Sequence, residues 1–209
     1  MPWILHHDLK DFDSKTIWHD KEADGSEPND IMRTLMSLPG KWPDPKYLPL
    51  HLHEIHENGK IYGFMQKSSG STLVSSSFRD FIEEWDPGHS FYIPVILYWR
   101  NGEVIKDQYF WHKFKDFIPD AFVMEDSDVK PIMRKGVIKP IMRKGVIRSY
   151  NIPRNPKLTW KSSSIAGRHF WAAEYLEEKT YVSDEFMDAI EARGDALFEK
   201  IQTFVKYIN

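Results

Sequence analysis

A helical pattern that begins at Val74 and ends at a Pro-Gly turn constrains the fold more than any other stretch. Ser75 is a natural N-cap, because its hydroxyl can accept a hydrogen bond from a backbone N–H of the first turn. Four apolar residues then recur at helical spacing: Phe78, Phe81, Ile82 and Trp85. Three acids fall on the opposite face and are expected in water: Asp80, Glu83 and Glu84. The sequence therefore predicts an amphipathic helix over residues 74–85, packed on a core.

Two strands joined by a tight turn are predicted directly after this helix. Residues 91–99 are almost continuously apolar, as expected of a strand that is covered on both faces. Pro94 has no backbone N–H and therefore indicates an edge position or a bulge. Asn101-Gly102 is a strong hairpin signal, since both residue types tolerate positive φ. Residues 104–114 supply the returning strand.

The helical pattern returns near the C-terminus. The Val-Ser pair of residues 74–75, and the Phe, Asp, Ile and Glu that follow it, recur in register from Val182 to Glu191. We interpret this as a second strand–cap–helix unit on the same mixed sheet. Residues 197–208 favour a terminal strand, with a helix as the alternative. The predicted class is α+β, with mixed, largely antiparallel sheets, hairpins and a few amphipathic helices.

Weaker patterns predict the remaining elements. The predicted strands are residues 3–9, a hairpin of 50–55 with 60–65 around Asn58-Gly59, and a pair at 158–164 and 169–173 around Ala166-Gly167. The other predicted elements are a loop at 10–30, a short helix at 31–38, a Ser/Gly loop at 67–72, and a helix at 183–192 that ends at Gly194.

The 209 residues fit one domain. Within that single domain, residues 1–209, we distinguish an N-terminal subregion, a core, an inserted repeat and a C-terminal strand–helix unit. Their boundaries are residues 1–66, 67–129, 130–147 and 157–209.

The inserted repeat consists of two identical copies of nine residues. This period is far below the ~20–50 residues of solenoid repeats, so we interpret it as an in-frame duplication that lengthens a hairpin or loop. The alternative is a basic arm for nucleic acid. That arm would use Lys130, Arg134, Lys135, Lys139, Arg143, Lys144 and Arg148. The lack of interleaved aromatic residues disfavours it.

Composition excludes several classes of protein. Aromatic residues make up 14% of the chain, which disfavours global disorder. The net charge of −3 lacks the basic excess of a typical nucleic-acid-binding protein. There are no cysteines, which fits a reducing compartment. Neither a signal peptide nor an apolar run of the ~20 residues needed to span a bilayer is present. We therefore expect a cytoplasmic protein.

The segment His51-Leu-His53-Glu-Ile-His56 is the most tempting chemical motif. On a strand, His51 and His53 would share a side, as in some metal sites. The motif superficially resembles the His-x-His-x-Asp-His signature of metallo-β-lactamases, but Ile55 stands at the position of the Asp. A metal-dependent hydrolase using these three histidines is the alternative function, and surface histidines are the favoured interpretation. Phosphate-binding loops and nucleophile motifs are absent. No catalytic, cofactor-binding or metal residue is therefore predicted.

The order of motifs resembles a bacterial family, the eleventh class of polymorphic-toxin immunity proteins. The residues that carry the resemblance are Leu73-Val74-Ser75, Asp86-Pro87-Gly88, Phe91, Pro94-Val95, Gly102-Glu103, Tyr109-Phe110, Ser127-Asp128, His169-Phe170-Trp171 and Tyr181-Val182-Ser183-Asp184. The duplicated segment is an insertion relative to this pattern.

The resemblance implies a non-enzymatic, cytoplasmic protein that binds and blocks a cognate toxin domain, commonly a nuclease. It implies a protein partner, with no membrane or nucleic-acid partner and no cofactor. It transfers no site residue, because the toxin contacts of such proteins vary with the toxin, and it makes no prediction of oligomeric state.

Overall fold

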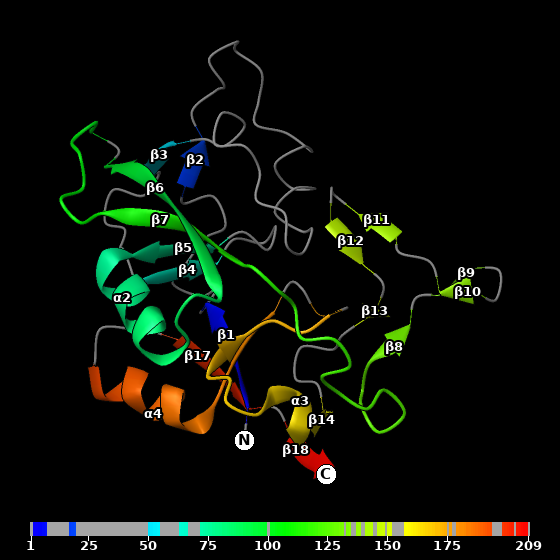
Figure 1. Cartoon of the computed structure of the whole chain (residues 1–209). Helices are drawn as coiled ribbons and strands as arrows, with labels where there is room; N and C mark the ends of the chain where they lie inside the picture. Colours follow the sequence, from blue (N-terminus) through cyan, green and yellow to red (C-terminus); the bar gives the residue numbers. More distant parts are fainter. Residues whose placement is uncertain are drawn as a thin grey trace.

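The computed structural model of the chain places two β-sheets around helices that share one apolar seam (Figure 1). The structure describes residues 2–7, 17–19, 50–54, 63–66, 72–99, 101–131, 133–134, 137–138, 141–143, 146–148, 150–151, 157–174, 176, 179–193, 198–202 and 204–208. Several predicted features lie outside the described residues: the helix at 31–38, most of the loop at 10–30, the Asn58-Gly59 turn, the loop at 67–71 and the helix end at Gly194.

The larger of the two main sheets is mixed, and the smaller is antiparallel throughout its described strands. The larger contains, in spatial order, β2 (Ile17–His19), β3 (His51–Glu54), β6 (Ser90–Tyr98), β7 (Tyr109–Phe114), β5 (Thr72–Ser75) and β4 (Phe64–Gln66). The smaller contains β15 (Phe170–Trp171), β16 (Thr180–Val182), β1 (Trp3–His7) and β17 (Phe198–Gln202). Within them only β3 and β6 run parallel. The predicted α+β class is confirmed.

The first strand–cap–helix unit is β5 followed by α2 (Ser76–Trp85). The Ser75 hydroxyl caps the helix, accepting the backbone N–H of Phe78 at 3.2 Å. Val74 is paired with Phe110 in β5, so the prediction that the helix starts at Val74 is wrong. The backbone N–H of Asp86 donates to the Ile82 carbonyl and closes the helix, as the Asp-Pro-Gly turn predicts.

The second unit repeats this construction with β16 and α4 (Asp184–Arg193). The Ser183 hydroxyl accepts the backbone N–H of Phe186 at 3.2 Å, the same separation as in the first cap. The echo predicted from the sequence is therefore confirmed. The units belong to different sheets, however, so the prediction of one shared sheet is wrong. Among the helices of the described residues, none has the length and apolar character needed to cross a membrane.

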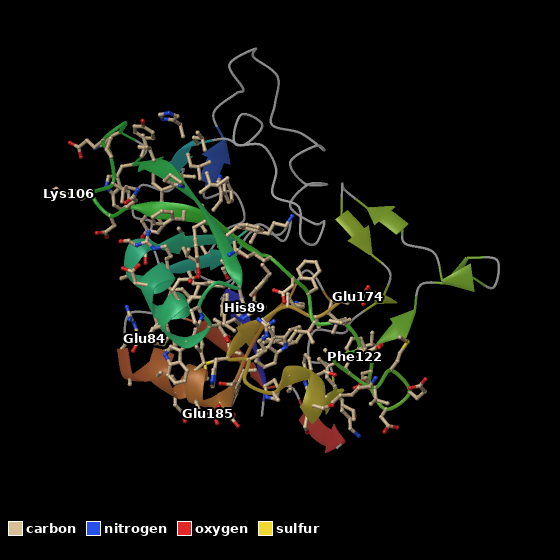
Figure 2. The ribbon with its side chains drawn as sticks, viewed as in Figure 1. Glu84, His89, Lys106, Phe122, Glu174 and Glu185 are labelled. Atoms are coloured by element: carbon tan, nitrogen blue, oxygen red, sulfur yellow. The ribbon has the colours of Figure 1, made fainter. Side chains whose placement is uncertain are left out.

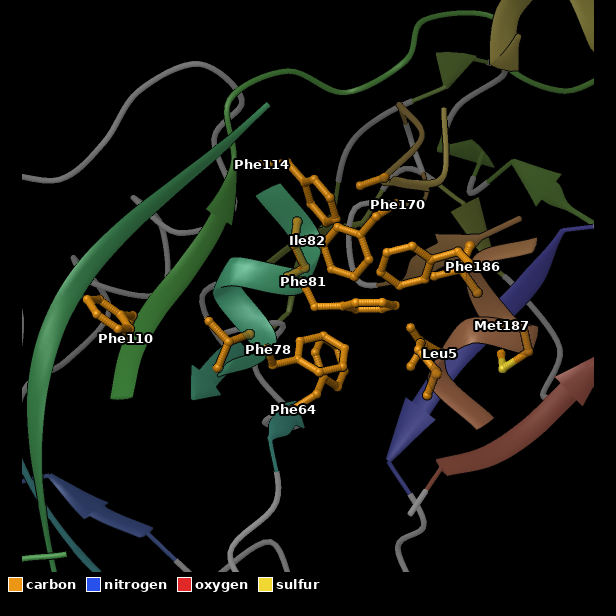
Figure 3. Close-up of a cluster of buried hydrophobic side chains, with 14 residues drawn as sticks. Leu5, Phe64, Phe78, Phe81, Ile82, Phe110, Phe114, Phe170, Phe186 and Met187 are labelled. Carbon is orange, nitrogen blue, oxygen red and sulfur yellow. The ribbon is translucent and has the colours of Figure 1, made fainter. Parts of the chain in front are cut away.

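The apolar stripes of α2 and α4 pack against each other and belong to one buried cluster, not to two separate cores (Figure 3). The Phe81 and Phe186 rings lie 4.8 Å apart, and Trp85 packs edge-on against Phe186 at 5.7 Å. Phe170 of β15 joins them, 5.6 Å from Phe186. Each such ring stabilises by roughly 1.5–3 kcal/mol through burial, so this seam holds the two sheets together.

The predicted hairpin of β6 and β7 is confirmed, but its returning strand begins later in the sequence than predicted. Gly102 has φ +86 and its N–H donates to the Trp99 carbonyl at 2.8 Å, as the tight turn requires. Val104 makes only an isolated bridge with Tyr98, and β7 begins at Tyr109, not at the predicted residue 104. A wider hairpin loop therefore precedes the strand.

Strand β6 lies inside the sheet rather than at its edge. Its partner β3 pairs with it only at Ile96 to Tyr98, so Pro94 lies where β7 is the only described neighbour. The missing N–H is therefore tolerated without a bulge. Pro94 and Ile96 are exposed while Val95 is buried, so coverage of both faces is wrong for this part of β6.

Three further features differ from prediction. β4 pairs with β5 and not with β3, so the hairpin of residues 50–55 with 60–65 is wrong. Residues 17–19 form a strand inside the predicted loop. Of the two strands predicted at 158–164 and 169–173, both are present as β14 (Lys157–Lys161) and β15, but residues 162–165 form the short helix α3 (Ser162–Ile165) instead of strand. The pairings of β3, with β2 and with β6, join residues far apart in the sequence, which local patterns do not report.

The C-terminal segment is confirmed as strand, which makes the helical alternative wrong. It divides into β17, which pairs with β1, and β18 (Phe204–Ile208), which runs parallel to β14.

The inserted repeat forms two consecutive hairpins with the same register. In the first copy, β9 (Met133–Arg134) pairs with β10 (Val137–Ile138); in the second, β11 (Ile141–Arg143) pairs with β12 (Val146–Arg148). In the backbone register, Met133 pairs with Ile138 as Met142 pairs with Ile147. Below them, β8 (Lys130–Pro131) pairs with β13 (Tyr150–Asn151). The interpretation that the duplication lengthens a hairpin is supported.

Candidate functional site

The first histidine of the predicted cluster is held by an aromatic neighbour. The parallel pairing of β3 with β6 brings His51 beside Tyr98, and their rings stack with centroids 5.7 Å apart. The Tyr98 hydroxyl lies 2.8 Å from His51 Nδ1. The side chains of His53 and His56 lie outside the described residues. Among the side chains that the structure does describe, no group of three or more His, Asp or Glu is placed to hold a metal.

The acids of α2 do not form a reactive cluster. Asp80 and Glu84 are exposed, as predicted, and Arg79 pairs with Asp80 at 2.6 Å. Glu83 is not left in water, contrary to prediction, because its Oε2 accepts the Gly88 N–H at 2.9 Å. This bond ties the helix to the turn that follows it. Figure 2 shows Glu84 on α2 and Glu185 on α4, both on the side of the molecule that carries the two helices.

A buried carboxylate joins the two strand–cap–helix units. Asp86 is 3% exposed, and its Oδ2 accepts the backbone N–H groups of His169, at 2.6 Å, and of Phe170. Burial raises the pKa of Asp86, and the two N–H donors oppose that rise. Asp86 thus fixes the start of β15 to the end of α2.

Beside Asp86, His169 and Ser183 make a pair that could be mistaken for a nucleophile and its base. His169 Nδ1 lies 2.9 Å from Ser183 Oγ. The Ser183 oxygen, however, accepts the N–H of Phe186 as a helix cap. Asp86 binds the backbone of His169 and not its imidazole, so it cannot orient the ring as in a catalytic triad. The geometry is that of capping.

A small pocket of about 270 Å³ opens between α3 and the start of α4. Its lining includes Gly167, Arg168, His169, Trp171 and Asp184. Two charged residues of this lining have partners. Arg168 binds Asp116 at 2.8 Å, and Asp184 accepts the indole N–H of Trp3 at 2.7 Å. Nothing in this lining resembles a catalytic arrangement.

Two basic residues of β7 are buried in the larger sheet. His112 is 3% exposed, lies 2.9 Å from the Ser90 hydroxyl, and packs against Phe114 and Phe170. Burial lowers its pKa to about 3, so the ring is neutral at physiological pH. Lys113 points to the opposite face, and burial lowers its pKa to about 8. Both residues are core components.

The charge of the chain is divided unequally along its length. Of the 28 Lys and Arg residues, seven lie in residues 130–148, which contain no acid. The rest of the chain therefore carries 21 Lys and Arg against all 31 Asp and Glu, a balance of −10. The described members of this set, Lys130, Arg134, Arg143 and Arg148, lie in short paired strands that are separate from the two main sheets. The modest total of −3 hides this separation.

Sequence reasoning found the caps but missed the residues that connect them. Ser75 and Ser183 act within three positions of their own N–H partners, so the local pattern reveals them. Asp86 meets Phe170 across 84 positions, and Arg168 meets Asp116 across 52. The only sequence signal for Asp86 was its place in the turn after α2.

The comparisons with known proteins give one family. The Immunity protein family (Imm11) matches residues 7–204, which is nearly the whole chain. A comparison with curated proteins found no match. The match covers both strand–cap–helix units, the hairpin between them and the inserted repeat. This protein therefore belongs to the Imm11 immunity protein family.

Proposed function

We propose that this protein neutralises a cognate toxin domain by binding it, inside the cytoplasm of the cell that makes the toxin. The observation that carries the proposal is the family match over residues 7–204. The partner is a protein, and the complex has one toxin domain for each immunity protein.

The acidic balance supports a nuclease as the toxin. Outside residues 130–148, acids outnumber Lys and Arg by 31 to 21. Enzymes that act on nucleic acid carry basic surfaces, because they must approach phosphates. An acidic inhibitor attracts such a surface at long range and gains association rate.

Inhibition by binding, without catalysis, fits the roles of the titratable groups. Asp86 holds two backbone N–H groups, and His112 is buried against aromatic rings. Ser183 is occupied as a cap. Each of these groups has a structural partner that accounts for its position.

The proposal is tested by self-protection. The gene immediately upstream of this protein's gene, where we expect the cognate effector, is expressed in cells with and without the immunity gene. Loss of viability only in cells that lack it is the expected result, and plasmid-borne expression of this chain should restore growth. Indifference of the deleted strain to the effector would contradict the proposal.

A metal analysis separates this proposal from the hydrolase alternative. That alternative needs His51, His53 and His56 as ligands, and the Nδ1 of His51 already faces the Tyr98 hydroxyl. Stoichiometric zinc in protein purified without a histidine tag, together with a rise in melting temperature on adding zinc, would favour the hydrolase.

A further inference from the structure

An exposed apolar surface lies on the part of the larger sheet that no described helix covers. Ile96 is 42% exposed and Val104 is 57% exposed. Val104 bridges Tyr98 across the hairpin, and Ile96 pairs with His51 of β3. Paired residues share a face of a sheet, so these side chains form one surface with the exposed Pro94. We use the term outer sheet face for the surface formed by five residues: His51, Pro94, Ile96, Tyr98 and Val104.

The exposure follows from the size of the covering helix. Alternate residues of β6, namely Ile93, Val95 and Leu97, point into the buried core on the opposite face. On the face of Ile96, α2 packs against β5 and β7. A helix is about 10 Å wide and neighbouring strands are about 4.8 Å apart, so one helix covers roughly two strands. The second half of β6 and the adjoining β3 are left beyond its reach.

The aromatic part of the outer sheet face is already ordered. The His51 and Tyr98 rings stack at an interplanar angle of 19°, and the Tyr98 hydroxyl is 2.8 Å from His51 Nδ1. Rings fixed before binding lose little conformational entropy when a partner docks. Tyrosine is also enriched among the residues that dominate binding energy, and a small apolar centre within a polar border is typical of protein interfaces.

The border of the outer sheet face carries exposed acids. Glu103 and Asp107 are exposed in the hairpin loop, which also carries one exposed base, the Lys106 labelled in Figure 2. The Arg79 guanidinium nearby is engaged by Asp80 and by the Phe110 ring, 4.5 Å from its centroid. Together with the acidic balance of the chain outside residues 130–148, this favours a partner whose surface is basic.

We propose that the outer sheet face is the surface that docks the toxin domain, and that the docking region of the toxin presents an apolar side chain surrounded by Lys and Arg. This inference rests on the proposed function. It places the contact at the β6 hairpin, away from the pocket near α3 and away from the duplicated hairpins.

Binding is measured by calorimetry or biolayer interferometry, with the purified C-terminal domain of the upstream effector as the probe. Ile96→Asp and Val104→Asp place a charge in the centre of the outer sheet face. Each should raise Kd by about thirtyfold or more, the effect of losing one dominant interface residue. Ile96→Thr keeps the branched side chain of a strand residue and should weaken binding less than Ile96→Asp.

Matched controls carry the same charge at other exposed sites. Ala166→Asp alters the lining of the α3 pocket, and Ala192→Asp alters the exposed side of α4. Deletion of residues 139–147 removes one copy of the repeat. All three should bind within about threefold of the wild type, which is within 0.7 kcal/mol. Circular dichroism and melting temperature confirm that each variant is folded.

The outcomes separate the inference from the proposed function. If the wild type binds and protects, but folded Ile96→Asp and Val104→Asp bind as tightly as the wild type, the docking surface is wrong and the function stands. A wild-type dimer that Ile96→Asp makes monomeric, without loss of toxin binding, would assign the surface to self-association and also overturn the inference. If the wild type neither binds nor protects, the proposed function is wrong, and the inference that rests on it falls with it.

Discussion

The Oδ2 atom of Asp86 accepts the backbone N–H of His169 at 2.6 Å, across 83 positions of sequence. The same oxygen accepts the N–H of Phe170, which opens β15. A single carboxylate at the end of α2 therefore positions the edge strand of the other sheet. The contact lies beside the seam where Phe81 and Phe186 meet, so polar and apolar links between the two units reinforce each other.

Removal of this carboxylate should destabilise the protein more than a typical surface change. Asp86→Ala leaves two backbone N–H groups without their acceptor, at a cost of roughly 1–3 kcal/mol for each buried group. Urea unfolding followed by tryptophan fluorescence measures the loss. Asp80→Ala, which removes an exposed acid of the same helix, should change the free energy of unfolding by less than about 0.5 kcal/mol. Equal effects from the two substitutions would contradict the role of Asp86.

Asp86 should also affect how stability varies with pH. Burial raises its folded-state pKa above the ordinary value, so the folded state takes up a proton more readily than the unfolded state does. The stabilisation from protonation is present below the unfolded pKa and is lost as pH rises through the folded pKa. The stability of the wild type relative to Asp86→Asn should therefore increase as pH falls from 7 towards 4. A difference that stays constant over that interval would show that Asp86 does not titrate as inferred.

The two serine caps should contribute nearly equally. Ser75 and Ser183 accept N–H groups at the same 3.2 Å in equivalent units. Replacement of either by alanine should cost about 1 kcal/mol, the usual value for a lost N-cap. Chemical denaturation of the two variants gives the comparison, with the exposed Ser163→Ala as the control. If only one of the two substitutions lowered the stability, the two caps would not be equivalent, which would contradict the prediction.

His112 should make the protein sensitive to acid. Its folded-state pKa is lowered to about 3, against an ordinary value near 6.5, so the unfolded state takes up the proton first. Its contribution is complete above about pH 6.5 and is lost as pH falls towards 3, by roughly a few kcal/mol in total. His112→Gln should flatten this part of the stability–pH curve measured by denaturation at fixed pH values. A slope that the substitution leaves unchanged would assign the acid sensitivity to other groups.

One copy of the repeat should be dispensable for folding. Each copy closes its own hairpin with the same register, so deletion of residues 139–147 leaves β8, β13 and the first hairpin with their partners. The melting temperature should shift by less than about 4 °C, which corresponds to under 1 kcal/mol at this chain length. Differential scanning calorimetry measures the shift. Loss of cooperative unfolding would show instead that the second copy packs on the main body.

Local chemistry explains which elements could be predicted from the sequence. The helices α2 and α4 follow from apolar spacing and serine caps, which act within three or four residues. The Asn101-Gly102 turn follows from the backbone freedom of these two residues. The start of α2 cannot be read from local pattern alone, because Val74 fits a helical stripe and a strand equally well, and its pairing with Phe110 makes it strand.

Long-range pairing explains what could not be predicted. Residues 50–55 and 60–65 resemble a hairpin locally, yet β3 pairs with β6 and β4 pairs with β5. The exposure of Ile96 is equally non-local, because it depends on which strands α2 covers. A candidate docking surface could thus emerge only once the sheet order was known. Glu83 seemed a solvated acid because its bond to the Gly88 N–H depends on the shape of the turn.

Titration of the upstream effector's toxin domain with this protein is the most direct test of inhibition by binding. The activity that we propose for the toxin, cleavage of nucleic acid, is followed as purified immunity protein is added. We predict that activity falls in proportion to the added protein and reaches zero near one equivalent, with a stable one-to-one complex on size exclusion. Full toxin activity at several equivalents of folded immunity protein would contradict neutralisation by direct binding.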